Sequence, residues 1–172
     1  MEEFMDKGKI SDVAPKQLDR ILSFFARVEA KASFIFAVDS ALLGTLAVHV
    51  ERSDFEKAFT VLLLSLFGIA IAASYLYIYR SASPNLDGGH SSLIYFREIA
   101  KLREQEFAKA FRAQTDESYI DDVLSQVWRN SQILTEKFTA VKKAFLFAGL
   151  SLLPWTAFLI FSSLIHVATP VK

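Results

Sequence analysis

The chain has no cysteine, and only six glycines and four prolines in 172 residues. Without cysteine it has no disulfide framework, no thiolate metal site and no cysteine nucleophile. So few glycines and prolines also exclude a collagen-like repeat and a low-complexity disordered chain. Lysine and arginine together number 19, as do aspartate and glutamate, so the net charge is zero. A broad nucleic-acid-binding surface is therefore not expected, because neutralising phosphates needs clustered excess cations.

The sequence also lacks the motifs of the common catalytic sites. Its three histidines, His49, His90 and His166, are not spaced as metal ligands, so no metal site is expected. It contains no P-loop, no GxSxG nucleophile elbow and no dinucleotide fingerprint. No nucleophile and base can be paired from the sequence either. We therefore expect a protein that is not an enzyme and that carries no cofactor.

Long uncharged runs dominate what is present. Residues 58–79 form a run of 22 residues without a charge, and residues 144–170 are equally free of one. Residues 32–50 form a third apolar run, interrupted by Asp39. A helix of about 20 apolar residues crosses the hydrocarbon core of a bilayer, whereas a helix in a soluble protein needs a polar stripe. The sequence predicts an all-α integral membrane helical bundle with transmembrane helices at 32–50, 58–79 and 144–168.

The distribution of cations predicts the orientation of these spans. Residues 1–31 carry six Lys and Arg and residues 80–143 carry ten, against two between the first two spans and one after the third. Cytoplasmic loops are enriched in Lys and Arg, so the side with 16 cations faces the cytoplasm. The protein is then multi-pass, with its N-terminus in the cytoplasm and its C-terminus on the opposite side of the membrane.

The first span is predicted to continue into the cytoplasm as a stalk. Apolar residues recur every three or four positions from Leu18 to Leu46, which is typical of one face of a single helix. Pro15 suits the first turn of that helix. Residues 1–31 are therefore interpreted as a cytoplasmic N-terminal segment and stalk helix.

Residues 80–143 are predicted to form a cytoplasmic helical hairpin. Residues 81–92 have the composition of a loop, and the apolar spacing from Leu93 to Phe111 predicts one helix that ends near residue 114. Thr115 is a good N-cap for a last helix that continues into the third span, where Pro154 should produce a kink. The first and last spans would thus extend into one cytoplasmic helical bundle.

Asp39 is the one acidic residue inside a predicted span. A carboxylate in a bilayer is costly and usually faces protein or an aqueous cavity. Two interpretations remain open: a pore-lining or conformational trigger group, or a hydrogen-bonded packing residue that sets helix register. The neighbouring Ser40 and Gly44 allow close approach of another helix under either interpretation.

Two polar faces are candidates for ligand binding. Lys16, Arg20, Arg27 and Lys31 share one face of the stalk and could bind a phosphate or anionic lipid headgroups, or could simply be a solvated cytoplasmic flank. On the last long helix, Gln126 and Asn130 could contact the edge of a base, and Lys137 a phosphate. The alternative is that these three form an ordinary polar outer face.

Three segments resemble conserved motifs of the Pycsar transmembrane effectors. The segment RVEAKASFIFAVDSALLG (27–44) resembles the opening motif of that family, with Glu29 at a position that is commonly Asp. Lys31, Ala32 and Ser33 match the motif, and Asp39 and Ser40 occupy the place of its Asn-Gly. LIYFREIAKL (93–102) is similar to the family's Phe-x-x-Ile-Ala segment, and SQVWRNSQILTEKFTAVKKAF (125–145) to its Gln…Ser…Lys segment.

The resemblance implies a bacterial antiphage effector in the inner membrane, which places the C-terminus in the periplasm. A cyclic pyrimidine mononucleotide, cCMP or cUMP, would activate it, and the activated protein would impair membrane integrity. The expected ligand-binding residues are Arg27, Glu29, Lys31, Gln126, Asn130 and Lys137, with Asp39 and Ser40 as intramembrane gating residues. A homo-oligomer is expected because three spans do not readily enclose a path. The alternatives are a membrane scaffold that recruits a partner, or an ion-conducting subunit that uses Asp39.

Overall fold

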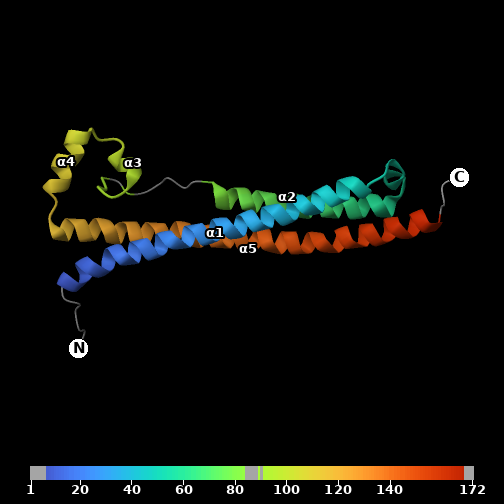
Figure 1. The fold of residues 1–172 in the computed structure, drawn as a ribbon, viewed down its shortest axis with the longest axis horizontal. Helices are drawn as coiled ribbons and strands as arrows, with labels where there is room; N and C mark the ends of the chain where they lie inside the picture. The colour runs from blue at the N-terminus through green and yellow to red at the C-terminus, as the bar shows by residue number, and fades with distance from the viewer. Residues whose placement is uncertain (1–6, 84–88, 90, 169–172) are drawn as a thin grey trace, which may run out of the picture. The chain divides into compact units, whose positions relative to one another are not determined.

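The computed structural model describes residues 7–83, 89 and 91–168, and every regular element among them is a helix. The elements are α1 (Lys7–His49), the 3-10 helix η1 (Arg52–Glu56), α2 (Ala58–Ala82), α3 (Phe96–Ile99), α4 (Glu104–Arg112) and α5 (Asp116–Ala168) (Figure 1). Three of them, α1, α2 and α5, are long and apolar enough to cross a membrane. The predicted all-α class with three membrane-spanning helices is therefore confirmed.

The chain divides into two compact units that share its two longest helices. The first unit comprises residues 1–27 and 84–136, and the second comprises residues 28–83 and 137–172. Helices α1 and α5 therefore each contribute residues to both units. Residues 84–88 and 90 of the predicted loop, including His90, lie outside the described residues.

A small apolar cluster joins α1 and α5 in the first unit. Ala14, Leu18 and Val123 are buried together, and Ile94, Tyr119 and Val127 pack against them. Helix α1 begins at Lys7, so Pro15 lies inside the helix and the prediction that it stands in the first turn is wrong. A proline removes one backbone hydrogen bond from a helix interior. Ala14, next to the proline, is buried in this cluster, and this packing helps to stabilise the helical conformation on both sides of Pro15.

The single helix predicted from Leu93 to residue 114 is also wrong, because two short helices, α3 and α4, occupy this segment. Arg103 is extended between them, with φ −74° and ψ 150°. Its backbone N–H donates to Glu106 Oε2 at 3.1 Å, and its guanidinium lies 2.8 Å from Glu106 Oε1. The carboxylate thus satisfies one of the free N–H groups at the start of α4 and favours a new helix there.

Helix α5 begins where the sequence predicts. Thr115 Oγ1 accepts a hydrogen bond from the Ser118 N–H at 3.3 Å, so Thr115 is the N-cap of α5. Ahead of it, Leu93 N–H donates to Asp122 Oδ2 at 2.9 Å and ties the start of the connecting segment to α5. Further along, α5 continues through Pro154 without interruption.

The second unit packs the remaining parts of α1 and α5 around α2. Its apolar cluster consists of Leu42 from α1 with Phe67 and Ile71 from α2. Partly buried residues from all three helices pack against this cluster: Val38, Leu46, Tyr75 and Trp155. Trp155 Nε1 also donates to the Leu42 carbonyl at 3.3 Å, which links α5 directly to α1.

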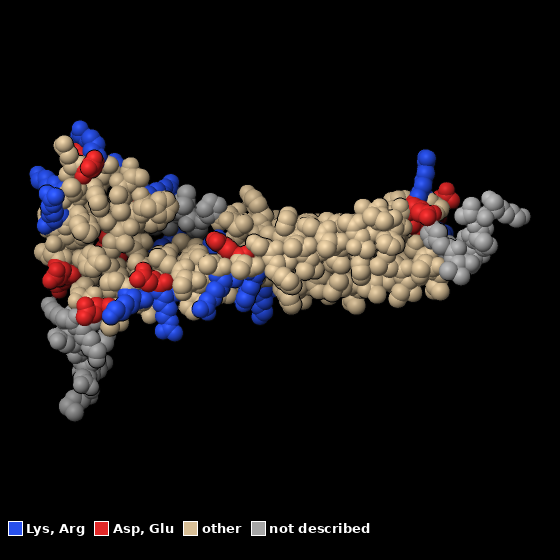
Figure 2. All heavy atoms as spheres, in the orientation of Figure 1, with Lys and Arg blue, Asp and Glu red and all other residues tan. Residues whose placement is uncertain are grey.

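The outward surface of the second unit is apolar where the spans lie. Figure 2 shows a stretch of this surface without Lys, Arg, Asp or Glu. Large apolar side chains are exposed on all three helices there, among them Phe34, Ile69 and Leu153, which are 66%, 69% and 71% exposed. Contiguous exposed apolar surface of this kind is unfavourable in water and matches the hydrocarbon of a bilayer.

Candidate functional site

Three of the predicted ligand-binding residues belong to the first unit. Arg27 is exposed on α1, and its guanidinium carbon lies 4.9 Å from the centre of the Phe24 ring. Gln126 is buried on α5 with 4% of its surface exposed, and Asn130 Nδ2 donates to its backbone carbonyl at 2.8 Å. The structure thus brings Gln126 and Asn130 together, whereas Arg27 contacts Phe24.

Gln126 carries an unsatisfied donor. Its side-chain Nε2 is buried and has no hydrogen-bond partner among the described residues. A buried amide without a partner costs about 1–3 kcal/mol relative to one that is paired. An acceptor that entered this position would remove that cost. Among the predicted ligand-binding residues of the first unit, Gln126 is the one with a buried donor that has no partner among the described residues.

The other three predicted ligand-binding residues belong to the second unit. Glu29 and Lys31 are exposed on α1, and Lys31 Nζ lies 5.6 Å from the centre of the Phe138 ring of α5. Lys137 is only 9% exposed, and its ammonium group donates to the backbone carbonyl of Ser81 near the end of α2. Lys137 therefore neutralises part of the negative end of α2, a role that the sequence did not indicate.

A buried hydrogen-bonded contact joins the three spans. Asp39 of α1 has no exposed surface, and Ser74 Oγ of α2 donates to its Oδ2 at 2.6 Å. The same hydroxyl lies 3.2 Å from the backbone carbonyl of Ala144 on α5. We call these three residues the three-helix contact. The second carboxylate oxygen, Asp39 Oδ1, is buried and has no hydrogen-bond partner among the described residues.

Ser40 lies beside this contact but faces outward. Its hydroxyl donates to the Phe36 carbonyl at 2.7 Å and lies 3.2 Å from the Tyr75 hydroxyl of α2. The pairs Asp39–Ser74 and Ser40–Tyr75 thus fix neighbouring positions of α1 and α2. Asp39 faces other helices, in agreement with its place in the apolar repeat.

A second cluster lies between α2 and α5, at the ends of their uncharged stretches. Tyr77 stacks on Phe147 with ring centres 5.7 Å apart. Lys143 Nζ and the guanidinium carbon of Arg80 lie 5.3 Å and 5.6 Å from the centre of the Tyr77 ring. The two cations make favourable cation–π interactions with the face of the tyrosine ring. Tyrosine is also enriched at membrane–water interfaces. This cluster marks the boundary between the charged and uncharged parts of the second unit.

Sequence reasoning missed Ser74 and Tyr77 as partners. A signal for Ser74 was present, because a carboxylate predicted to face another helix needs a donor and the run 58–79 has only three Ser or Thr hydroxyls. Three tyrosines end that run, at 75, 77 and 79, and their spacing does not show which one meets the cations of α5.

Comparison with known proteins gives a family. Residues 13–162 match the model of the Pycsar effector protein domain. The chain belongs to the Pycsar effector family. The family's match includes all of α2 and most of α1 and α5, and with them every predicted ligand-binding and gating residue.

A relative of this Pycsar effector is the Pycsar effector protein GmPycTM of Gulbenkiania mobilis. The two are 23% identical over 171 residues, an alignment that covers 83% of this chain and 87% of the relative. No solved structure matches the chain. Membership of the family identifies an antiphage defence effector, and the three candidate spans make it a membrane protein.

Proposed function

We propose that this Pycsar effector is a multi-pass protein of the bacterial inner membrane that cCMP or cUMP activates from the cytoplasm. The activated protein acts as a homo-oligomer and impairs the integrity of the membrane. It catalyses no reaction and needs no cofactor besides this activating ligand. The observation that carries the proposal is the family match over residues 13–162, which extends across the three candidate spans.

The nucleotide contacts that we favour are Arg27, Gln126 and Asn130 of the first unit. A cyclic mononucleotide carries one negative phosphate, which a guanidinium binds well. A pyrimidine base presents a carbonyl oxygen that would accept a hydrogen bond from the unpaired Gln126 Nε2. Glu29, Lys31 and Lys137 stay predictions, and Lys137 already donates to Ser81.

Helix continuity supports a link between ligand and membrane. Helices α1 and α5 contain the predicted nucleotide contacts and also residues of the three-helix contact, Asp39 and Ala144. A ligand that binds one arrangement of these helices more tightly shifts the population toward that arrangement. Its effect on the membrane is limited by that difference in affinity.

Ligand-dependent melting tests the proposal. Purified protein in detergent should melt at a higher temperature with cCMP or cUMP than with cAMP, because a ligand at 100 times its Kd stabilises the folded state by about 2.7 kcal/mol. Gln126→Leu should abolish the shift. Gln132→Leu, on the exposed face of the same helix, is the matched control and should retain it.

In liposomes, the same nucleotide should release a trapped dye. Activation by these nucleotides is wrong if neither shifts the melting temperature nor releases dye.

Single-cysteine labelling tests the orientation, and the absence of native cysteine makes it direct. Ser53 in η1 and Gln105 in α4 are both exposed. A membrane-impermeant maleimide added to spheroplasts should label Ser53→Cys at once and Gln105→Cys only after permeabilisation. The reverse pattern would place the N-terminus outside and contradict the proposed topology.

A further inference from the structure

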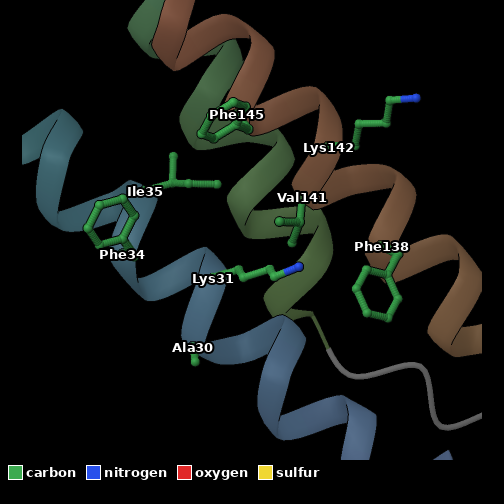
Figure 3. Close-up of a pocket in the computed structure, with 8 residues that line it drawn as sticks. All are labelled: Ala30, Lys31, Phe34, Ile35, Phe138, Val141, Lys142 and Phe145. Atoms are coloured by element: carbon green, nitrogen blue, oxygen red, sulfur yellow. The ribbon is translucent and has the colours of Figure 1, made fainter.

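A groove between α1 and α5 lies in the second unit and has a volume of about 520 Å³. Six of its lining residues are apolar and two are lysines (Figure 3): Ala30, Phe34, Ile35, Phe138, Val141 and Phe145, with Lys31 and Lys142. Phe34 and Phe145 are each 66% exposed, although they are among its largest side chains. Its walls are therefore open apolar surface with two cations.

We propose that this groove binds an anionic phospholipid, with an acyl chain against the phenylalanines and the headgroup phosphate between Lys31 and Lys142. Lys31 directly precedes the apolar run of α1 at residues 32–50, in which Asp39 is the one charged residue, and Lys142 lies two residues before the uncharged stretch that begins at 144. Both ammonium groups therefore lie at one boundary of the apolar surface. Phosphates of lipid headgroups lie at that depth, and lysines there extend toward them.

The two lysines approach the groove from different helices. In Figure 3 Lys31 reaches from α1 toward α5, and the Lys142 side chain leaves α5 at the rim of the groove and extends away from Lys31. Lys31 Nζ lies 5.6 Å from the centre of the Phe138 ring, so its ammonium group is next to the apolar lining of the groove. The aliphatic stems of both lysines add to the apolar lining.

The chemistry of the walls distinguishes a lipid from a nucleotide. A base and a ribose need several hydrogen-bond partners, because a buried polar group without one is costly. The side chains that line the groove offer two ammonium groups and no acceptor. In a phospholipid, the hydrocarbon chain would contact the apolar side chains of the groove, and the single phosphate would bind the two ammonium groups.

Native mass spectrometry of the detergent-purified protein, without nucleotide, tests this proposal independently of the proposed activation. With equimolar phosphatidylglycerol and phosphatidylcholine, the protein should retain phosphatidylglycerol preferentially. The double variant Lys31→Gln/Lys142→Gln should bind phosphatidylglycerol about 30-fold more weakly, at about fivefold per lysine. The double variant Arg80→Gln/Lys143→Gln removes the same charge beside Tyr77 and should bind as the unmodified protein does.

A third variant and two competitors complete the test. Ala30→Trp fills the groove at an exposed position and keeps both lysines, so it should also lose phosphatidylglycerol. Millimolar inorganic phosphate should not displace the lipid, since phosphate brings no acyl chain. The proposal is overturned by equal retention of both lipids, by equal losses in the two double variants, or by undiminished binding to Ala30→Trp. Displacement by phosphate, or one-for-one displacement by cCMP or cUMP, would also overturn it.

Discussion

Phe67→Ala should lower the free energy of unfolding by about 3–5 kcal/mol, the usual cost of truncating a buried phenylalanine. Phe67 is 2% exposed and packs with Leu42 and Ile71 in the cluster that joins α1 and α2. Lipid chains are as apolar as the side chain, so burial from water contributes little between helices. The loss would come from the cavity and from the packing contacts that disappear with the ring.

Leu66→Ala is the matched control for this variant. Leu66 is the preceding residue of α2 and is 49% exposed on the apolar surface. Lipid replaces the contacts of a truncated outward side chain, so we expect a change within about 0.5 kcal/mol. Equilibrium unfolding in mixed detergent micelles measures both variants. Equal losses would show that the two side chains have similar surroundings and contradict the packing of α2.

Ser74→Val should lower the free energy of unfolding by about 1–3 kcal/mol, the cost of leaving a buried polar group without its partner. Valine replaces the hydroxyl with a methyl group at nearly constant volume, and Asp39 then loses the 2.6 Å hydrogen bond to its Oδ2. Its Oδ1 already has no partner among the described residues. Asp39 would therefore be a buried carboxylate without a hydrogen bond from another helix.

Asp39→Leu should restore much of this loss in the Ser74→Val background, because an apolar pair replaces an unpaired polar group. Ser65→Val is the control, since Ser65 is exposed on the same helix and donates to the carbonyl of Val61 in its own helix. The same melting and unfolding measurements apply. If Asp39→Leu adds its own loss to that of Ser74→Val, the hydrogen bond between them is not what stabilises the spans.

Asp39→Asn separates the packing interpretation from ion conduction. Asparagine keeps an oxygen that accepts from Ser74, so a packing residue would tolerate the change. A conducting carboxylate would not, and the variant would lose conduction while it still folds and assembles. Burial of Asp39 among three helices of one chain favours the packing interpretation.

The spans were predictable because the length and apolar composition of each run indicate a membrane-spanning helix without any knowledge of the helices that pack against it. A run of 22 residues without a charge has one favourable environment, and α2 begins at the residue where that run begins. The N-cap at Thr115 was equally local, since its partner lies three residues along the chain. The inward direction of Asp39 followed from its spacing within the apolar repeat.

Most of the features that were missed depend on contacts between distant residues. The capping of α4 by Glu106 is short-range, yet the apolar spacing of the segment concealed it and predicted one helix. The role of Lys137 depends on its contact with the Ser81 carbonyl near the end of α2, 56 residues earlier in the chain. Likewise, the unpaired amide of Gln126 depends on what surrounds α5, which helical periodicity does not specify. The groove at Lys31 and Lys142 required the pairing of α1 with α5.

The three-helix contact restricts how the spans can move. A slide of α5 by one helical turn displaces the Ala144 carbonyl by about 5.4 Å and separates it from Ser74, and rotation of α5 by one residue turns that carbonyl away. A tilt of the helices about Asp39 and Ser74 preserves both hydrogen bonds. The contact is therefore a pivot. Ala144 is the first residue of the uncharged stretch of α5, and Ser74 lies five residues before the end of that of α2, so this pivot lies near one end of the spans. Opening of the membrane part by tilting would therefore spread the other end of the spans, beside η1, far more than the level of Asp39.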